Sequence, residues 1–241
     1  MFRIFGPPGT GKTTKLLNLV DKHLEAGVEP TNIAFLAFTR KAAEEARERA
    51  AARFNLDPKQ DLFFFKTLHS LALAMTDIRT DQVMQPEHYR ELGKSIGVNL
   101  GAAADNRFSD IPETQKSSDP ILGLINLAIL RKVPLRTQYN ISQIDESWNV
   151  VKYVDEALTK YKKSYTLYDF TDMLRVFAET GQSCCPRFAV TFLDEAQDLS
   201  PLQWDIAHML DRQSERMYCA GDDDQAIYRW AGADVDQFIG L

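Results

Sequence analysis

The sequence lacks any apolar run long enough to form a membrane-spanning helix. Hydrophobic residues make up 44% of its 241 residues and charged residues 26%, which is ordinary for a soluble globular domain. A spanning helix needs roughly 20 consecutive apolar residues, and the few residues before Gly6 leave no room for a secretory signal. We therefore expect no membrane partner and a cytoplasmic location.

Cysteine is also scarce. The chain has 3 cysteines, Cys184, Cys185 and Cys219, of which the first two are adjacent. Adjacent cysteines do not have the spacing of zinc ligands, and three cannot form a disulfide framework. Reduced thiols in a reducing compartment are the simplest interpretation.

An excess of positive charge is missing as well. The formal net charge is -6 and the isoelectric point is about 5.3. The overall field therefore does not attract nucleic acid. If DNA binds to this chain, a local groove has to supply the attraction.

What the chain does have is a series of short apolar runs, each followed by polar or glycine-containing residues and then a helical pattern. Helices are predicted over Lys12–Ala26, which Gly27 ends as a cap, and over Lys41–Phe54. Strands alternating with helices predict an α/β fold, a parallel sheet with helices on both faces. The predicted buried strands are Phe2–Phe5, Ile33–Phe38, Leu62–Lys66, Phe188–Leu193 and Arg216–Ala220.

The middle of the chain has a different pattern. From about Gln82 to Ser164 no convincing buried strand occurs, whereas Ile121–Leu130 and Trp148–Tyr161 have helical patterns and Asn99–Asp119 is a polar loop. We interpret residues 82–164 as a helical insertion in an α/β domain formed by residues 1–81 and 165–241. Three lysines in this insertion form either a solvated helix face or a phosphate contact, namely Lys160, Lys162 and Lys163.

The most specific motif follows the first predicted strand. Gly6-Pro-Pro-Gly-Thr-Gly-Lys-Thr13 matches the phosphate loop pattern G-x-x-x-x-G-K-[ST], and its position between a strand and a helix argues against a chance glycine-rich turn. Its glycines let backbone N–H groups point at phosphates, Lys12 can reach the β- and γ-phosphates, and Thr13 offers a hydroxyl to Mg²⁺. The predicted nucleotide contacts are Gly6, Pro7, Pro8, Gly9, Thr10, Gly11, Lys12, Thr13 and Thr14.

A pair of carboxylates follows the predicted strand Phe188–Leu193. Asp194 at the carboxyl end of a parallel strand faces the ligand crevice and would hold Mg²⁺ together with Thr13. Glu195 would polarise the water that attacks the γ-phosphate. Such a pair can also be an ordinary acidic strand end, but beside a phosphate loop it predicts ATP and Mg²⁺ as cofactors.

Longer segments resemble the UvrD/Rep-like superfamily 1 DNA helicases. The matches follow the order of that family and span most of the chain, and the family places a helical subdomain between its motifs Ib and II. The resemblance therefore implies a P-loop NTPase domain of the RecA-like type with an inserted helical subdomain. The matching segments are Phe35-Leu-Ala-Phe-Thr-Arg-Lys-Ala-Ala43 (motif Ia), Thr67-Leu-His-Ser70 (motif Ib), Leu167-Tyr-Asp-Phe-Thr-Asp-Met-Leu174 before motif II, Asp194-Glu-Ala-Gln-Asp-Leu-Ser200 (motif II) and Ala220-Gly-Asp-Asp-Asp-Gln-Ala-Ile-Tyr-Arg-Trp-Ala-Gly-Ala-Asp234 (motif III).

The resemblance also implies roles for single residues. Gln225 would contact the γ-phosphate and join Lys12, Asp194 and Glu195 as a catalytic residue. Aromatic residues would stack on the bases of single-stranded DNA, and hydroxyl and cationic groups would line its backbone. The implied DNA contacts are Phe38, Thr39, Arg40, His69, Tyr228 and Trp230.

Local structural roles compete with several of these assignments. Phe38 and Trp230 can be core residues, His69 can be a locally packed side chain, and Arg40 and Lys41 can be surface charges at a helix start. These alternatives remain open from the sequence alone.

Three departures from the family pattern are visible. Ala231 stands where the family often has arginine, and no adenine-contacting glutamine precedes the phosphate loop, so the choice of nucleobase stays open. The sequence also contains no second RecA-like domain, the part that supplies arginine fingers worth about 10³ to 10⁵ in rate. We therefore expect slow hydrolysis by this chain alone and a second domain in cis or in trans as a partner.

The leading functional hypothesis is the ATP-binding half of a DNA helicase or translocase, with a 3′-to-5′ direction implied by the resemblance. The alternative is a nucleotide-gated DNA-binding module without motor activity of its own. A small-molecule P-loop kinase is disfavoured, because nothing resembles an acceptor lid and Gly221-Asp-Asp-Asp-Gln225 has no clear role in such an enzyme.

Overall fold

The computed structural model describes residues 1–7, 10–100, 119–222 and 233–240. Five strands form one sheet in the order β1-β5-β4-β2-β3, and every neighbouring pair is parallel. The predicted parallel α/β fold is thus confirmed. The strands are β1 (Phe2–Phe5), β2 (Ile33–Ala37), β3 (Phe65–Thr67), β4 (Phe188–Leu193) and β5 (Ser214–Gly221).

Two hydrophobic cores cover the two faces of this sheet. In β2 all five side chains are buried, and they alternate between faces because successive residues of a strand point to opposite sides. Ile33 and Phe35 pack with α1 and α2, whereas Ala34 and Leu36 pack with α3, α8 and α9. The helices concerned are α1 (Lys12–Glu25), α2 (Arg40–Phe54), α3 (Leu68–Met75), α8 (Phe170–Cys184) and α9 (Pro201–Arg212).

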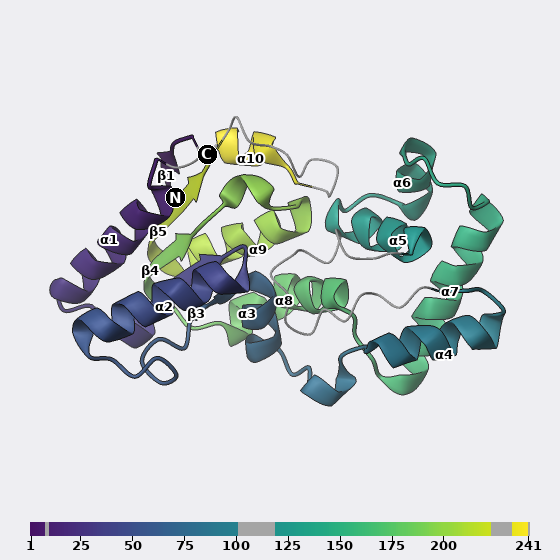
Figure 1. The fold of residues 1–241 in the computed structure, drawn as a ribbon, viewed down its shortest axis with the longest axis horizontal. Coiled ribbons are helices and arrows are strands. Elements are labelled where there is room, and N and C mark those ends of the chain that lie inside the picture. The colour runs from purple at the N-terminus through teal and green to yellow at the C-terminus, as the bar shows by residue number, and fades with distance from the viewer. Residues whose placement is uncertain (8–9, 101–118, 223–232, 241) are drawn as a thin grey trace.

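Four helices form a separate group beside the sheet (Figure 1). They share a core of their own, in which Leu92, Ile125 and Val154 are buried. Within the described part of this stretch, from Gln85 to Ser164, no strand occurs. The helices are α4 (Pro86–Ile96), α5 (Pro120–Leu130), α6 (Leu135–Ile141) and α7 (Trp148–Tyr165).

The chain leaves the sheet region and returns to it at one place. The N–H of Met84 donates to the carbonyl of Tyr168 at 2.8 Å, and the N–H of Tyr168 donates to the carbonyl of Gln82 at 2.8 Å. The two connections between the sheet and the helical group therefore run side by side. Short helical segments complete the described chain: η1 (Pro30–Asn32), η2 (Thr80–Gln82), η4 (Ala196–Asp198) and α10 (Val235–Gly240).

Two details of the sequence prediction are wrong. The strand predicted at Leu62–Lys66 begins only at Phe65, because the N–H of Phe65 closes a turn by donating to the carbonyl of Leu62 at 3.1 Å. Of the three lysines in the insertion, Lys160 and Lys163 are exposed, as a solvated helix face requires, but Lys162 is not. Its Nζ donates to buried Asp169 at 2.7 Å and to Asp172 at 2.6 Å, so this ion pair joins α7 to the start of α8.

Other predicted boundaries agree well with the structure. α1 ends at Glu25, and Gly27 follows the cap with φ of 84°, a left-handed conformation that glycine adopts without strain. β1 and β4 have the predicted bounds. In the part of the chain that the structure describes, no helix combines the length and the apolar character needed to cross a bilayer.

Candidate nucleotide-binding site

The phosphate loop connects β1 to α1. Gly11 has φ of 80° and stands at the N-terminal end of α1, as the curl of such a loop requires. A Cβ on Gly6 would lie 2.5 Å from Thr10 Oγ1, so this position has no room for a side chain. Of the predicted contacts, Pro8 and Gly9 lie outside the described residues.

Lys12 turns back over the loop. Its Nζ donates to the carbonyl oxygens of Gly6 at 2.6 Å and Pro7 at 3.3 Å, and lies 3.8 Å from Asp222 Oδ2. The two carbonyl oxygens accept the ammonium hydrogens that phosphate oxygens of a bound nucleotide would accept. The ammonium group is thus held at the mouth of the loop, where an anion can take over its hydrogen bonds.

Thr13 and Asp194 meet across the sheet edge. Thr13 Oγ1 donates to Asp194 Oδ2 at 2.8 Å, and Asp194 is 1% exposed at the end of β4. Burial raises the pKa of Asp194 to about 6, although the Thr13 hydrogen bond works in the opposite direction. A hydroxyl and a carboxylate oxygen are the donors that Mg²⁺ prefers, and a cation here would favour the ionised carboxylate. The residues present therefore fit this metal.

Glu195 has an unusual backbone conformation. Its φ of 54° and ψ of 43° place it in the left-handed region, which costs a residue other than glycine about 1 kcal/mol or more and is frequent at functional sites. Its Oε2 accepts a hydrogen bond of 2.9 Å from Gln197 Nε2. Glu195 is only partly buried, so its side chain keeps contact with the solvent side of the sheet edge.

Sequence reasoning did not single out three neighbours of this site, Gln197, Asp198 and Asp222. All three are buried, at 4%, 8% and 1% exposed. Burial, with the charges of Glu195 and Asp222, raises the pKa of Asp198 to about 7. The motif II and motif III segments contain these residues, but only the fold reveals that the two segments touch here.

The predicted DNA contacts that can be placed follow β2 and β3, next to Asp194. Phe38 and His69 line one small cavity together with Asp194, with a volume of about 40 Å³. Thr39 caps α2 by accepting a hydrogen bond from the N–H of Ala42 at 3.2 Å, and Arg40 pairs with Glu44 at 3.1 Å. The structure thus brings these four residues to the same sheet edge as the phosphate loop.

The surroundings of the His69 ring determine its protonation state. Its ring packs edge-on against Phe170 with centroids 5.9 Å apart, and burial lowers its pKa to about 4. The imidazole is therefore neutral at pH 7. It can donate one hydrogen bond to a phosphate oxygen but carries no positive charge.

Gln225, Tyr228 and Trp230 lie outside the described residues. The residues on both sides of that stretch, however, are bound to the loop after Asp194. The N–H of Asp222 donates to Gln197 Oε1 at 3.0 Å, and the N–H of Asp234 donates to the carbonyl of Leu199 at 2.8 Å. Asp222 and Asp234, which flank that stretch, are therefore held by the loop that follows the carboxylate pair.

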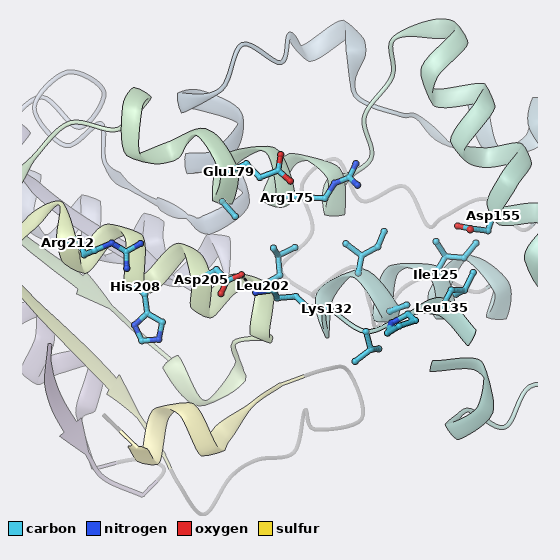
Figure 2. A pocket seen from close by; sticks show the side chains of 15 residues that line it. Ile125, Lys132, Leu135, Asp155, Arg175, Glu179, Leu202, Asp205, His208 and Arg212 are labelled. Carbon is cyan, nitrogen blue, oxygen red and sulfur yellow. Dashed lines mark ion pairs between the residues drawn. The ribbon is translucent and has the colours of Figure 1, made fainter. Parts of the chain in front are cut away.

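A larger pocket of about 1050 Å³ lies elsewhere, between α5, α8 and α9 (Figure 2). Apolar residues such as Ile125 and Leu202 line it, and Lys132 and Asp205 form an ion pair of 2.5 Å at its side. None of the nucleotide, metal or DNA contacts predicted from the sequence lines this pocket. Although it is the larger of the two cavities described here, we therefore do not assign the nucleotide to it.

The chain is similar to known proteins over nearly its whole length. The family model described as the UvrD/REP helicase N-terminal domain matches residues 2–241. The chain belongs to the UvrD/REP helicase N-terminal domain family. Among its relatives, the ATP-dependent DNA helicase PcrA of Leuconostoc citreum is 27% identical over 251 residues, covering 99% of this chain and 32% of the relative. The ATP-dependent DNA helicase Rep of Buchnera aphidicola is 26% identical over 252 residues, covering 99% and 38%.

Membership in the UvrD/REP family confirms the resemblance inferred from the motifs. The chain spans about a third of the length of the curated relatives that it matches.

Proposed function

We propose that this chain is the ATP-binding motor part of an ATP-dependent DNA helicase that moves along single-stranded DNA. The observation that carries the proposal is the hydrogen bond of 2.8 Å between Thr13 and Asp194, next to the Lys12 ammonium. A phosphate loop with its lysine, and a hydroxyl and a strand-end carboxylate that hold Mg²⁺, are the parts with which P-loop NTPases bind a nucleoside triphosphate. Family membership supports ATP as the nucleotide.

In the proposed reaction, Lys12 binds the β- and γ-phosphate oxygens and Glu195 orients the attacking water. The water oxygen forms a bond to the γ-phosphorus while Glu195 accepts a proton. The bond between that phosphorus and the bridging oxygen breaks, which yields ADP and phosphate. Thr13 and Asp194 would hold Mg²⁺, which when bound neutralises charge that develops on the phosphate oxygens.

Single-stranded DNA is proposed to cross the ends of β2 and β3. Phe38 would stack on a base, and Thr39, Arg40 and His69 would contact the backbone phosphates. The register of the sheet supports this path, since Ala37 pairs with Thr67 and Leu36 pairs with Leu193. Gln225, Tyr228 and Trp230 are proposed to complete the path and to sense the γ-phosphate, and the 3′-to-5′ direction rests on the resemblance alone.

The helical group, residues 82–164, is proposed to be a subdomain inserted in the RecA-like domain. A second RecA-like domain, in cis or in trans, is the proposed partner, because translocation requires two domains that open and close on ATP. The greater length of the relatives supports this part of the proposal.

The rate of ATP hydrolysis, measured with and without single-stranded DNA, tests the proposal. It should be measured for this chain and for the chain joined to a second RecA-like domain from its own coding sequence or a neighbouring one. Stimulation by DNA in the two-domain protein is the expected result. Absence of stimulation in both proteins contradicts the motor, and nucleotide-dependent DNA binding without hydrolysis would favour a gated binding module.

A further inference from the structure

Gln197 connects the carboxylate pair to the end of β5. Its Nε2 donates to Glu195 Oε2 at 2.9 Å and to Asp198 Oδ2 at 3.3 Å, and its Oε1 accepts from the N–H of Asp222 at 3.0 Å. The side chain therefore uses both ends of its amide. With Gln197 only 4% exposed, bulk water does not compete for these contacts.

The chemistry of this position requires an amide. Glu195 and Asp198 both carry carboxylates, and a neutral donor placed between them stabilises the negative charge of each. An ionised carboxylate at position 197 could still accept from the Asp222 N–H, but it could not donate to its neighbours. Asp198 Oδ1 is buried and has no hydrogen-bond partner among the described residues. The other carboxyl oxygen of Asp198, Oδ2, accepts its hydrogen bond from Gln197.

The space for the amide comes from a neighbouring glycine. A Cβ on Gly221 would lie 2.7 Å from Gln197 Oε1 and 2.7 Å from the Phe238 ring. Phe238 is 0% exposed and cannot move aside easily. The end of β5 is therefore shaped so that the Gln197 amide can reach the Asp222 backbone.

The Asp222 end of this connection leads to the phosphate loop. Asp222 Oδ2 lies 3.8 Å from Lys12 Nζ, so the contacts run from Glu195 through Gln197 and Asp222 to Lys12. Two groups that act on the same γ-phosphate in the proposed reaction are thus linked through one buried side chain.

We propose that Gln197 is a positioning residue: its amide holds the Glu195 carboxylate toward the attacking water and ties that orientation to the backbone of Asp222. This inference rests on the proposed ATP hydrolysis. Gln197 acts through Glu195 and touches neither water nor nucleotide in the reaction.

Two substitutions test the hydrogen bonds of the Gln197 amide. Gln197→Met removes both hydrogen-bonding ends, whereas Gln197→Glu is of equal size and keeps the acceptor while losing the donor. The matched control is Gln138→Met in α6, because Gln138 is 1% exposed and also makes two side-chain hydrogen bonds, with Arg131 and Ser142. Its distance from the site leaves only the structural consequence of removing a buried amide.

The measurement is kcat for ATP hydrolysis with single-stranded DNA, in the chain joined to its second RecA-like domain, together with the Kd of a non-hydrolysable ATP analogue. Both Gln197 variants should lose about 10-fold to 100-fold in kcat, as expected for a misplaced general base, while the Kd changes less than about threefold. Gln138→Met should keep the wild-type kcat. Should Gln197→Met fail to fold, Gln197→Glu alone decides.

A second background distinguishes positioning from general structural support. In Glu195→Gln, adding Gln197→Met should cause no further loss of the residual single-turnover rate, because the group that Gln197 positions is already gone. Equal losses in both backgrounds, or wild-type kcat in both Gln197 variants, overturn the inference. A wild-type protein that does not hydrolyse ATP at all would instead overturn the proposed function on which the inference depends.

Discussion

Thr13 in the phosphate loop and Asp194 at the end of β4 are separated by 181 positions in the sequence and share a hydrogen bond of 2.8 Å. The order of the strands explains how they meet. β5 lies between β1 and β4, so the loop after β1 and the carboxylate after β4 open on the same edge of the sheet. Ligands of open parallel sheets bind at this edge, outside the carboxyl ends of the strands.

Replacing the loop lysine should remove nucleotide binding. Lys12→Ala takes away the one ammonium group that the structure holds over the loop carbonyls. We expect the affinity for ATP, measured by calorimetry, to fall by at least about tenfold, since charge-assisted hydrogen bonds contribute roughly 1.5–3 kcal/mol. Lys15→Ala is the control, because Lys15 is an exposed residue in the first turn of α1. This variant should bind ATP normally. Unchanged affinity in Lys12→Ala would mean that the nucleotide binds elsewhere.

Glu195→Gln should separate binding from turnover. The amide retains the size of the side chain but cannot accept a proton from water, so hydrolysis should slow by about 10² to 10⁴. ATP affinity should remain near that of the wild type. Steady-state hydrolysis and calorimetry on the same preparation test both halves, with exposed Glu215→Gln as the control. Retained turnover would show that another group acts as the base.

Asp198 should make the protein less stable as the pH rises. Its pKa is raised to about 7 from an ordinary 3.8, so between about pH 4 and pH 7 the folded state holds a proton that the unfolded state has lost. The free energy of unfolding therefore falls as the pH rises through this window. Asp194, with a pKa of about 6, contributes in the same direction up to that pH.

Asp198→Asn should consequently stabilise the protein at pH 8, on the order of 2 kcal/mol. The slope of the unfolding free energy against pH, from urea denaturation between pH 4 and 8, should also become shallower. Asp205→Asn is the control, because Asp205 pairs with Lys132 at the surface, where such pairs contribute about 1 kcal/mol or less. An unchanged slope in Asp198→Asn would show that Asp198 titrates normally.

Gly221→Ala should damage both stability and catalysis. The added methyl group would press on Gln197 and on the buried Phe238 ring, each 2.7 Å away. Overpacking of this kind costs about 1–3 kcal/mol, and displacement of Gln197 should lower kcat as well. Melting temperature and kcat measure the two effects. Gly240→Ala, where a Cβ would meet nothing within 4 Å, should change neither.

Much of the fold was predictable because apolar runs in the sequence correspond to buried strands of the sheet. β4 (Phe188–Leu193) is a run of apolar residues between polar ones, and its predicted bounds match the structure because a parallel strand buries both of its faces. The run Leu62–Lys66 misled the prediction, because Leu62 is buried from within a turn rather than from a strand. Burial alone does not distinguish these two cases in a sequence.

The site was predictable where a motif fixes the chemistry. Thr13 meets Asp194 as the phosphate loop and the strand end require, and Lys12 lies 3.8 Å from Asp222 at the end of β5. The position of Lys162 was not predictable, because its partners Asp169 and Asp172 belong to another helix. Contacts of this kind depend on how helices pack, and a periodic pattern carries no information about them.

The contacts of Gln197 illustrate the same limit inside the site. Gln197 and Asp222 are 25 positions apart, and their hydrogen bond exists only because β4 and β5 are neighbours in the sheet. The left-handed backbone of Glu195 was equally invisible, since glutamate has no preference for that conformation. The sequence predicted which groups react, and the structure adds the contacts that hold them.

One edge of this sheet is proposed to bind a triphosphate and single-stranded DNA and to couple the two. Fluorescence anisotropy of a labelled oligonucleotide, titrated with the protein in the presence and absence of a non-hydrolysable ATP analogue, measures this coupling most directly. The analogue should change the DNA affinity by about fivefold or more, the lower end of typical allosteric coupling, and Lys12→Ala should abolish this change. DNA affinity that is the same with and without the analogue, in a protein shown to bind both, would mean that the two sites are not coupled.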